Sequence, residues 1–155
     1  MDYLLLKWLH ILSSAFLFGT GIGSAFYMLA VTLARDVRAT AVVARYVVIA
    51  DWLFTTPAII VQPVTGFMML HLAGIPLASR WVVATIILYL VAGACWLPVV
   101  WMQMKMRDMA MAAARAGEAE LPALYWRYFS FWVLLGIPAF LALVLVFWLM
   151  VAKPV

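Results

Sequence analysis

The chain has 155 residues, of which 70% are hydrophobic and only 10% are charged. A soluble domain of this length could not bury so much apolar surface, because ordinary globular chains are about half apolar and roughly a quarter charged. The formal net charge of +4 comes from scattered lysines and arginines without a basic run between aromatic residues, which argues against nucleic acid as a partner. The composition predicts an all-α, polytopic membrane protein surrounded by the lipid bilayer.

Four apolar segments are each near or above the length of about 20 residues that a bilayer core requires. They cover residues 3–33, 46–72, 81–104 and 124–151. Short connections between successive spans favour antiparallel neighbours. The sequence therefore predicts a single domain over residues 1–155, folded as an antiparallel bundle of four transmembrane helices.

The first span carries many polar and small residues for a membrane helix. Lys7, His10, Ser14, Gly21 and Ser24 recur at helical steps and fall on one stripe. An ionisable side chain is expensive to place in a bilayer, so this stripe is expected to face protein and to mark a candidate site. The small residues at positions 19–24 are predicted to permit close helix packing.

The second span has a matching stripe, which is expected to face the first. Its members at helical steps are Asp51, Thr55, Ala58, Gln62, Gly66 and Met69. Pro57 and Pro63 each remove a backbone donor, so a kink or local unwinding is expected there. Asp51 is predicted to pair with Arg45 or to interact with the helix terminus, with a proton-relay role as the alternative.

The third helix is expected to continue beyond its span as far as Gly117, because alanine and methionine are strong helix formers. The fourth span opens on aromatic residues that suit the membrane–water interface. These residues are Tyr125, Trp126, Tyr128 and Phe129.

Basic residues are divided unequally between the two ends of the predicted bundle. The side of the first and third connections holds Arg35, Arg38, Arg45, Lys105, Arg107, Arg115 and Arg127. The other side holds only Lys7, Arg80 and Lys153. The positive-inside rule then predicts that both termini lie outside, which in the bacterial inner (cytoplasmic) membrane is the periplasmic face.

This orientation brings both histidines to the outer half of the membrane. Neutral imidazole is the commonest side-chain ligand of haem and of many transition metals, and facing helices often hold such a cofactor between them. The sequence therefore predicts a haem b with His10 and His71 as candidate iron ligands. Lys7 and Arg80 lie at the same depth and suit the haem propionates, and Ser14 completes the candidate site.

Each histidine also has a simpler interpretation. His71 lies nine positions from Gln62, about half a turn round the helix, and could be an interfacial residue that faces lipid headgroups. His10 could make an interhelical hydrogen bond to Ser14 or to a side chain of the second helix. Two histidines without a neighbouring cysteine or carboxylate also fall short of a zinc or copper cage.

Three segments of the chain resemble a known family. The segments are KWLHILSSAFLFGTGIGSAFYM, DWLFTTPAIIVQPVTGFMM and YWRYFSFWVLLGIPAF. They resemble the uncharacterised bacterial integral membrane proteins grouped as domain-of-unknown-function family 2269, a resemblance that covers nearly the whole chain and implies no settled activity. More distantly, K-W-L-H followed by small residues is similar to HemJ-type protoporphyrinogen oxidases and related four-helix haem b membrane proteins. That second resemblance implies a haem iron bound by His10 with Lys7 close by.

The leading hypothesis is a membrane redox or electron-transfer protein with haem b in the outer half of the bundle. Two axial histidines would favour electron transfer to a quinone or another membrane redox protein, whereas ligation by His10 alone would leave a position open for oxidation chemistry or gas sensing. One alternative is a cofactor-free structural or small-solute transport subunit, favoured by prolines that interrupt three spans. A HemJ-like protoporphyrinogen oxidase is a further alternative, and a homo-oligomer stays open.

Overall fold

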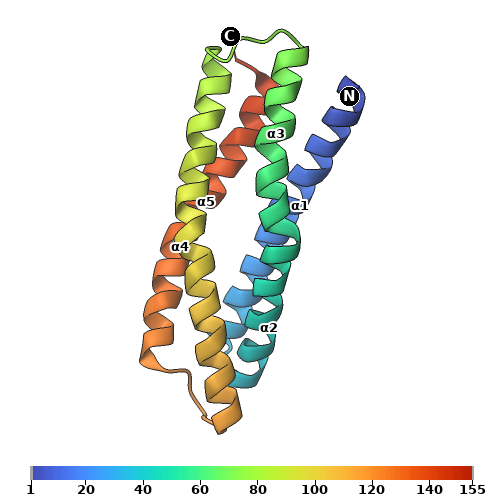
Figure 1. The fold of residues 1–155 in the computed structure, drawn as a ribbon. Helices are drawn as coiled ribbons and strands as arrows, with labels where there is room; N and C mark the ends of the chain where they lie inside the picture. Colours follow the sequence, from blue (N-terminus) through green and yellow to red (C-terminus); the bar gives the residue numbers. More distant parts are fainter. Residues whose placement is uncertain (1, 155) are drawn as a thin grey trace.

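The computed structural model describes residues 2–154, and over that range the chain forms helices and no strand. The elements are α1 (Tyr3–Leu33), α2 (Val37–Ala50), the π-helical turn η1 (Asp51–Thr55), α3 (Thr56–Leu72), α4 (Arg80–Ala116) and α5 (Ala123–Ala152). The segments α2, η1 and α3 follow one another without a break, so the chain makes four long antiparallel rods (Figure 1). All four are long and apolar enough to cross a membrane, which confirms the predicted all-α, four-span architecture.

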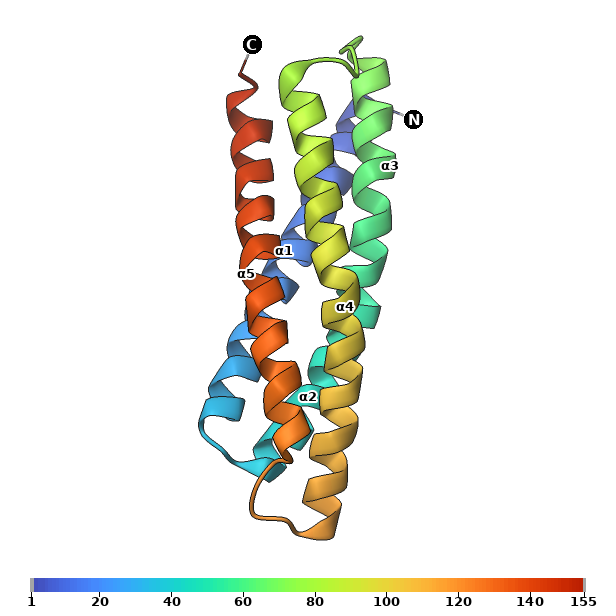
Figure 2. The same cartoon turned by 90° about the vertical axis from the view of Figure 1, so that its left-hand side faces the viewer.

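Both termini lie at the same end of the bundle, together with the loop between α3 and α4 (Figures 1 and 2). The connections between α1 and α2 and between α4 and α5 lie at the opposite end. We call these the termini end and the loop end. The basic residues counted from the sequence therefore separate in space as expected, with the first and third connections together at the loop end.

Local capping explains where the helices begin and end. The Asp36 carboxylate accepts a hydrogen bond of 2.9 Å from the Ala39 amide, so α2 begins at Val37 rather than at Tyr46, where the second span was expected to start. At the other boundary, α4 continues to Ala116 and stops at Gly117, which has a φ of 72°. This left-handed conformation favours glycine and ends the helix where the sequence predicted.

The best-packed core lies toward the loop end, where α2 and α5 pack against α4. Met28, Met106 and Ala110 are fully buried there. Tyr125 is 0% exposed, and its hydroxyl lies 2.9 Å from that of Thr32 on α1. Tyr125 and the buried Phe129, two of the aromatic residues expected to suit the membrane–water interface, therefore pack against neighbouring helices inside the bundle.

The turn η1 is a local unwinding of the second span just before Pro57, whereas at Pro63 the helix α3 continues and the unwinding expected there is not observed. The backbone N–H of Thr56 bonds to the Asp51 carbonyl five residues earlier, and the Thr56 hydroxyl donates to the same oxygen at 2.9 Å. Pro57 follows within the first turn of α3, where its missing N–H costs little. One wide turn thus joins the two regular helices α2 and α3.

Close packing at the glycines of α1 is not observed. A Cβ atom added at Gly19, Gly21 or Gly23 would meet no other atom of residues 2–154 within 4 Å. That prediction is wrong within this chain, because these glycines border open space or lipid. The close approach occurs instead at Gly66 of α3, where an added Cβ would lie 3.4 Å from Cε1 of His10.

Replacing Tyr125 by phenylalanine should test the buried link between α1 and α5. The variant Tyr125→Phe leaves the Thr32 hydroxyl buried without this partner, and we expect the free energy of unfolding to fall by about 1 kcal/mol. Thermal unfolding in detergent, followed by circular dichroism, measures the change. The control is Tyr27→Phe, since Tyr27 is 62% exposed; an equal loss in both variants would contradict the assignment.

Candidate functional site

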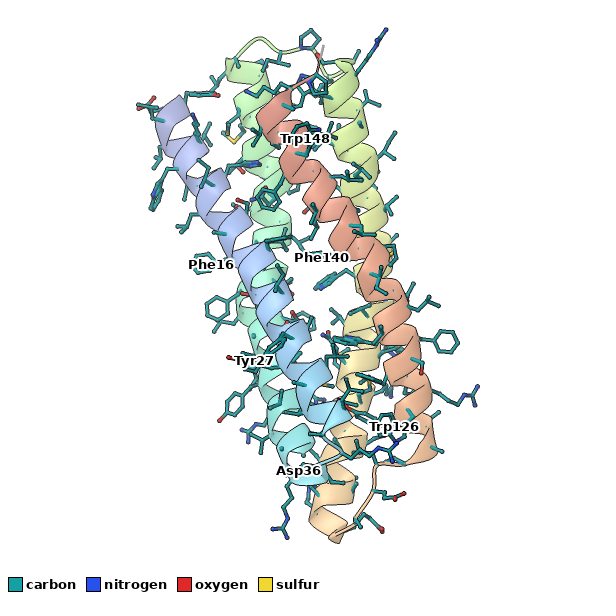
Figure 3. All side chains as sticks on the ribbon, turned by 180° about the vertical axis from the view of Figure 1, so that it is seen from behind. Phe16, Tyr27, Asp36, Trp126, Phe140 and Trp148 are labelled. Carbon is teal, nitrogen blue, oxygen red and sulfur yellow. The ribbon has the colours of Figure 1, made fainter. Side chains whose placement is uncertain are left out.

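Two cavities lie one above the other inside the bundle, and both are bordered by α1 and α5. Helix α1 packs mainly on α2 and α3, and α5 packs mainly on α4. The backbones of α1 and α5 are therefore not closely packed, and side chains project into the space between them (Figure 3). The cavity toward the termini end has a volume of about 440 Å³, and the other has about 400 Å³. We call them the His10 cavity and the Asp51 cavity. Leu17, Phe18 and Leu143 line both and form their shared wall.

The His10 cavity is apolar apart from a few side chains. Its polar lining includes Tyr3, Lys7, His10, Ser14, Gln62, Tyr89 and Lys153. Aromatic and aliphatic residues such as Trp81, Leu70 and Phe147 form the rest of the wall. Three of the residues predicted from the sequence, Lys7, His10 and Ser14, therefore meet in one cavity.

A hydrogen bond to α3 fixes the ring of His10. Nδ1 lies 2.8 Å from the Thr65 hydroxyl, and that hydroxyl also lies 2.7 Å from the Val61 carbonyl, which can only accept. Because a hydroxyl has one proton, Thr65 donates it to Val61 and accepts from Nδ1. The ring therefore carries its proton on Nδ1 and has its lone pair on Nε2.

Gln62 adds a second link between the same helices. Its Nε2 group donates to the His10 carbonyl and to the Ser13 hydroxyl, both at 2.7 Å. The Ser13 hydroxyl in turn lies 3.1 Å from the same carbonyl. Gly66 leaves room for the imidazole at van der Waals distance. The two polar stripes predicted from the sequence do face each other, and the interhelical hydrogen bond expected for His10 is made to Thr65.

Two lysines stand at the rim of the His10 cavity. Lys7 comes from the first turns of α1, and Lys153 follows the last residue of α5. The Lys153 ammonium lies 5.9 Å from the centre of the Trp81 ring, in a cation–π arrangement. Both lysines remain exposed, so two positive charges border the cavity at the termini end.

His71 and Arg80 are not among the residues that line this cavity. His71 is exposed in the last turn of α3, because nine positions of helix turn it about half a turn away from Gln62. Arg80 is exposed at the start of α4. The structure therefore brings His10 and Lys7 together but leaves His71 outside, and the second cation at the cavity rim is Lys153 rather than Arg80.

Ser14, although it lines the cavity, bonds within its own helix, since its hydroxyl donates to the Ile11 carbonyl at 2.7 Å. Sequence reasoning did not select Ser13, Thr65 or Lys153. Thr65 had a signal, because it lies one position from Gly66 and three from Gln62 on the helical face that was expected to meet α1. Ser13 and Lys153 had none, since their contacts depend on how α3 and α4 are placed.

The Asp51 cavity holds a second group of buried polar side chains. Asp51 lies in the turn η1 and is 4% exposed. Its carboxyl group accepts a 3.0 Å hydrogen bond from the Thr55 hydroxyl, and the Gln103 side chain approaches it from α4. Gln103 Oε1 and Trp132 Nε1 are buried without a hydrogen-bond partner in residues 2–154. All four side chains line the cavity.

The expected pairing of Asp51 with Arg45 is wrong. Arg45 is exposed, and across residues 2–154 the ion pair found is Arg107 with Asp108, at 2.8 Å. Asp51 turns instead toward the bundle interior because η1 places it on the same side as Thr55. Within the same residues, no three His, Cys, Asp or Glu side chains gather in a way that could hold a metal ion.

Comparison with known proteins gives one match. The family described as "Predicted integral membrane protein (DUF2269)" matches residues 4–154. Neither the curated proteins nor the solved structures contain a match to the chain. The resemblance to HemJ-type proteins stays a prediction that depends on the motif around Lys7 and His10.

The tautomer of His10 can be measured directly. In haem-free protein labelled with ¹⁵N-histidine, we expect one ring with its proton on Nδ1, because the Thr65 hydroxyl accepts there. Thr65→Val removes the acceptor and should shift the ring toward the Nε2–H tautomer that free imidazole prefers. Exposed His71 is the internal control, and His10→Ala assigns the signals. A wild-type His10 with its proton on Nε2 would contradict the hydrogen-bond directions.

Proposed function

The chain belongs to this family of predicted integral membrane proteins. We propose that it binds one b-type haem in the His10 cavity and acts as a membrane redox protein. The observation that carries the proposal is the distance of 2.8 Å between His10 Nδ1 and the Thr65 hydroxyl. A hydrogen bond from Nδ1–H to Thr65 leaves the Nε2 lone pair available in an apolar cavity. A histidine oriented by a partner on its other nitrogen is the usual arrangement for an iron or zinc ligand.

The rest of the cavity also fits this group. A volume of about 440 Å³ with mostly apolar walls is of the size that cofactor sites have. Lys7 and Lys153 stand at the rim, where their charges suit two propionate groups. Gly66 keeps the space beside the imidazole free. The cavity therefore offers a candidate iron ligand, apolar walls and two cations in one place.

Ligation would involve a single histidine, since His71 is exposed outside the cavity. The thioethers of Met69 and Met150 line the same cavity and are the available side chains of a type that binds haem iron on the opposite face. Haem supplies one-electron redox chemistry when it is bound. The chain's own contribution is to orient the ligand, exclude water from the pocket and hold the propionates.

The direction of the bundle in the membrane follows from charge. The loop end carries the arginine-rich connections and the termini end carries three cations, so we place the loop end in the cytoplasm and the termini end at the periplasmic face of a bacterial inner membrane. The His10 cavity then lies in the periplasmic half. The electron-transfer partner of the protein would be a quinone or another membrane redox protein.

Small-solute transport is a second candidate, and one observation favours it. The two cavities share a wall of Leu17, Phe18 and Leu143, so they lie next to each other along the bundle. In a cofactor-free transporter, Asp51 and His10 would be the polar side chains that contact the solute as it passes through the two cavities. A haem protein contains a cofactor that absorbs visible light, whereas a cofactor-free transporter does not. The absorption experiment below therefore distinguishes the two functions.

Absorption spectroscopy tests the haem proposal. Protein expressed with haem supplementation and purified in detergent should show a Soret band and a dithionite-reduced minus oxidised difference spectrum. His10→Ala should abolish both, because it removes the iron ligand, and the double variant Lys7→Gln, Lys153→Gln should weaken haem retention.

The matched control for this experiment is His71→Ala. His71 lies outside the cavity, so the variant should keep the wild-type spectrum. Folded wild-type protein without a Soret band would contradict the proposal and would favour the transport candidate. Equal losses in the two histidine variants would overturn the assignment of His10.

A further inference from the structure

We infer that the Asp51 cavity binds the aromatic head group of a lipid-soluble hydroquinone, in its reduced form. The inference extends the proposed redox function by giving its small-molecule partner a site. The Asp51 cavity alone supports this site, and its polar side chains are not among the groups that would hold a haem in the His10 cavity.

Unpartnered polar atoms deep in the bundle are the first argument. Gln103 is 4% exposed and Trp132 is 7% exposed, yet Oε1 of the first and Nε1 of the second have no hydrogen-bond partner in residues 2–154. A buried polar group without a partner is costly, especially in a bilayer without water. Both side chains line the same cavity, so a bound ligand that satisfies them would recover this cost.

The types of group present define the ligand chemistry. Gln103 Oε1 and the Asp51 carboxyl group accept hydrogen bonds, whereas the Trp132 indole N–H donates one. A phenolic hydroxyl has one proton to donate and lone pairs that accept, so a hydroxyl of a hydroquinone can donate to Gln103 Oε1 or to Asp51 and also accept from the Trp132 N–H. A quinone carbonyl only accepts and would leave Gln103 Oε1 unpaired. Asp51 also disfavours an anionic head group.

The walls suit a flat ring with an apolar substituent. Aromatic side chains of Phe18, Trp96 and Phe140 line the cavity, and aromatic rings pack favourably against one another. Phe140 lies between α5 and α1 in Figure 3, and its ring stacks on that of Phe18 at 5.6 Å. Gly136 adds space, since a Cβ there would meet no atom of residues 2–154 within 4 Å.

The cavity is also reached from the lipid. Ile137 is 56% exposed and Phe140 is 45% exposed, although both line the cavity. An apolar tail could therefore pass between α1 and α5 into the bilayer. On the other side, Phe18 also packs edge-on against Phe147 at 5.0 Å and borders the His10 cavity. A ring bound beside Asp51 would lie directly behind the wall of the proposed haem pocket.

Isothermal titration calorimetry with duroquinol tests the inference on haem-free wild-type protein in detergent, under anaerobic conditions. We expect saturable binding of one molecule per chain. Duroquinone should bind about tenfold more weakly, because a site with buried acceptors rejects an analogue without donors. Gln103→Leu and Trp132→Phe should each weaken duroquinol binding by about tenfold, since each removes one hydrogen-bonding group.

Two variants serve as matched controls. Thr85→Val removes a hydroxyl that is likewise buried without a partner in residues 2–154 but lines neither cavity. Trp101→Phe removes an indole outside both cavities. Both should bind duroquinol as the wild type does. Gly136→Leu adds a side chain to the cavity without removing a polar group and should weaken duroquinol binding by reducing the space for the ring, which keeps the test decisive if a polar variant fails to fold.

Absence of saturable binding to folded wild-type protein would overturn the inference. Equal affinity for duroquinol and duroquinone, or equal losses in the site variants and the controls, would also overturn it. Because the titration uses haem-free protein, its result does not depend on the Soret band. Duroquinol binding in the absence of a Soret band would support the hydroquinone site and contradict the haem proposal. A Soret band without duroquinol binding would support the haem proposal alone.

Discussion

The hydrogen bond between the Thr65 hydroxyl and the His10 ring is the contact on which the termini-end half of the molecule depends. In a bilayer, attraction between helices cannot come from apolar side chains alone, because lipid tails are equally apolar. Thr65, with the Gln62 amide beside it, holds α1 against α3 through polar groups. The same bond orients the imidazole, so one interaction serves both the packing and the chemistry of the His10 cavity.

The two halves of the bundle are built differently. Toward the loop end, α4 is covered by α2 and α5, and fully buried side chains such as Met106, Ala110 and Tyr125 fill the interior. Toward the termini end, α1 and α5 border the His10 cavity, while the Asp51 cavity adjoins core residues such as Trp132. The packed core thus supports both cavities from one end, which is the arrangement expected when a site must keep its shape without being filled by side chains.

The fold was largely predictable from the sequence, because apolar length and helical periodicity report directly on membrane spans. The stripe that contains Lys7, His10 and Ser14 was also predictable, since it depends only on positions within one helix. The wrong and missing assignments depend on contacts between helices. The burial of Tyr125 depends on its neighbours from other helices, and Lys153 reaches the cavity rim from the far end of the chain. Neither spacing nor composition specifies such distant contacts.

The π-helical turn Asp51–Thr55 determines how far α3 is rotated about its axis relative to α2. A regular α-helix advances by 100° per residue, and one wide turn delays that advance by about one residue. If the turn were regular, the face of α3 that carries Gln62, Thr65 and Gly66 would rotate by roughly 100° relative to α2 and would no longer meet His10. The few residues around Asp51 therefore set the rotational phase of a helix face several turns away.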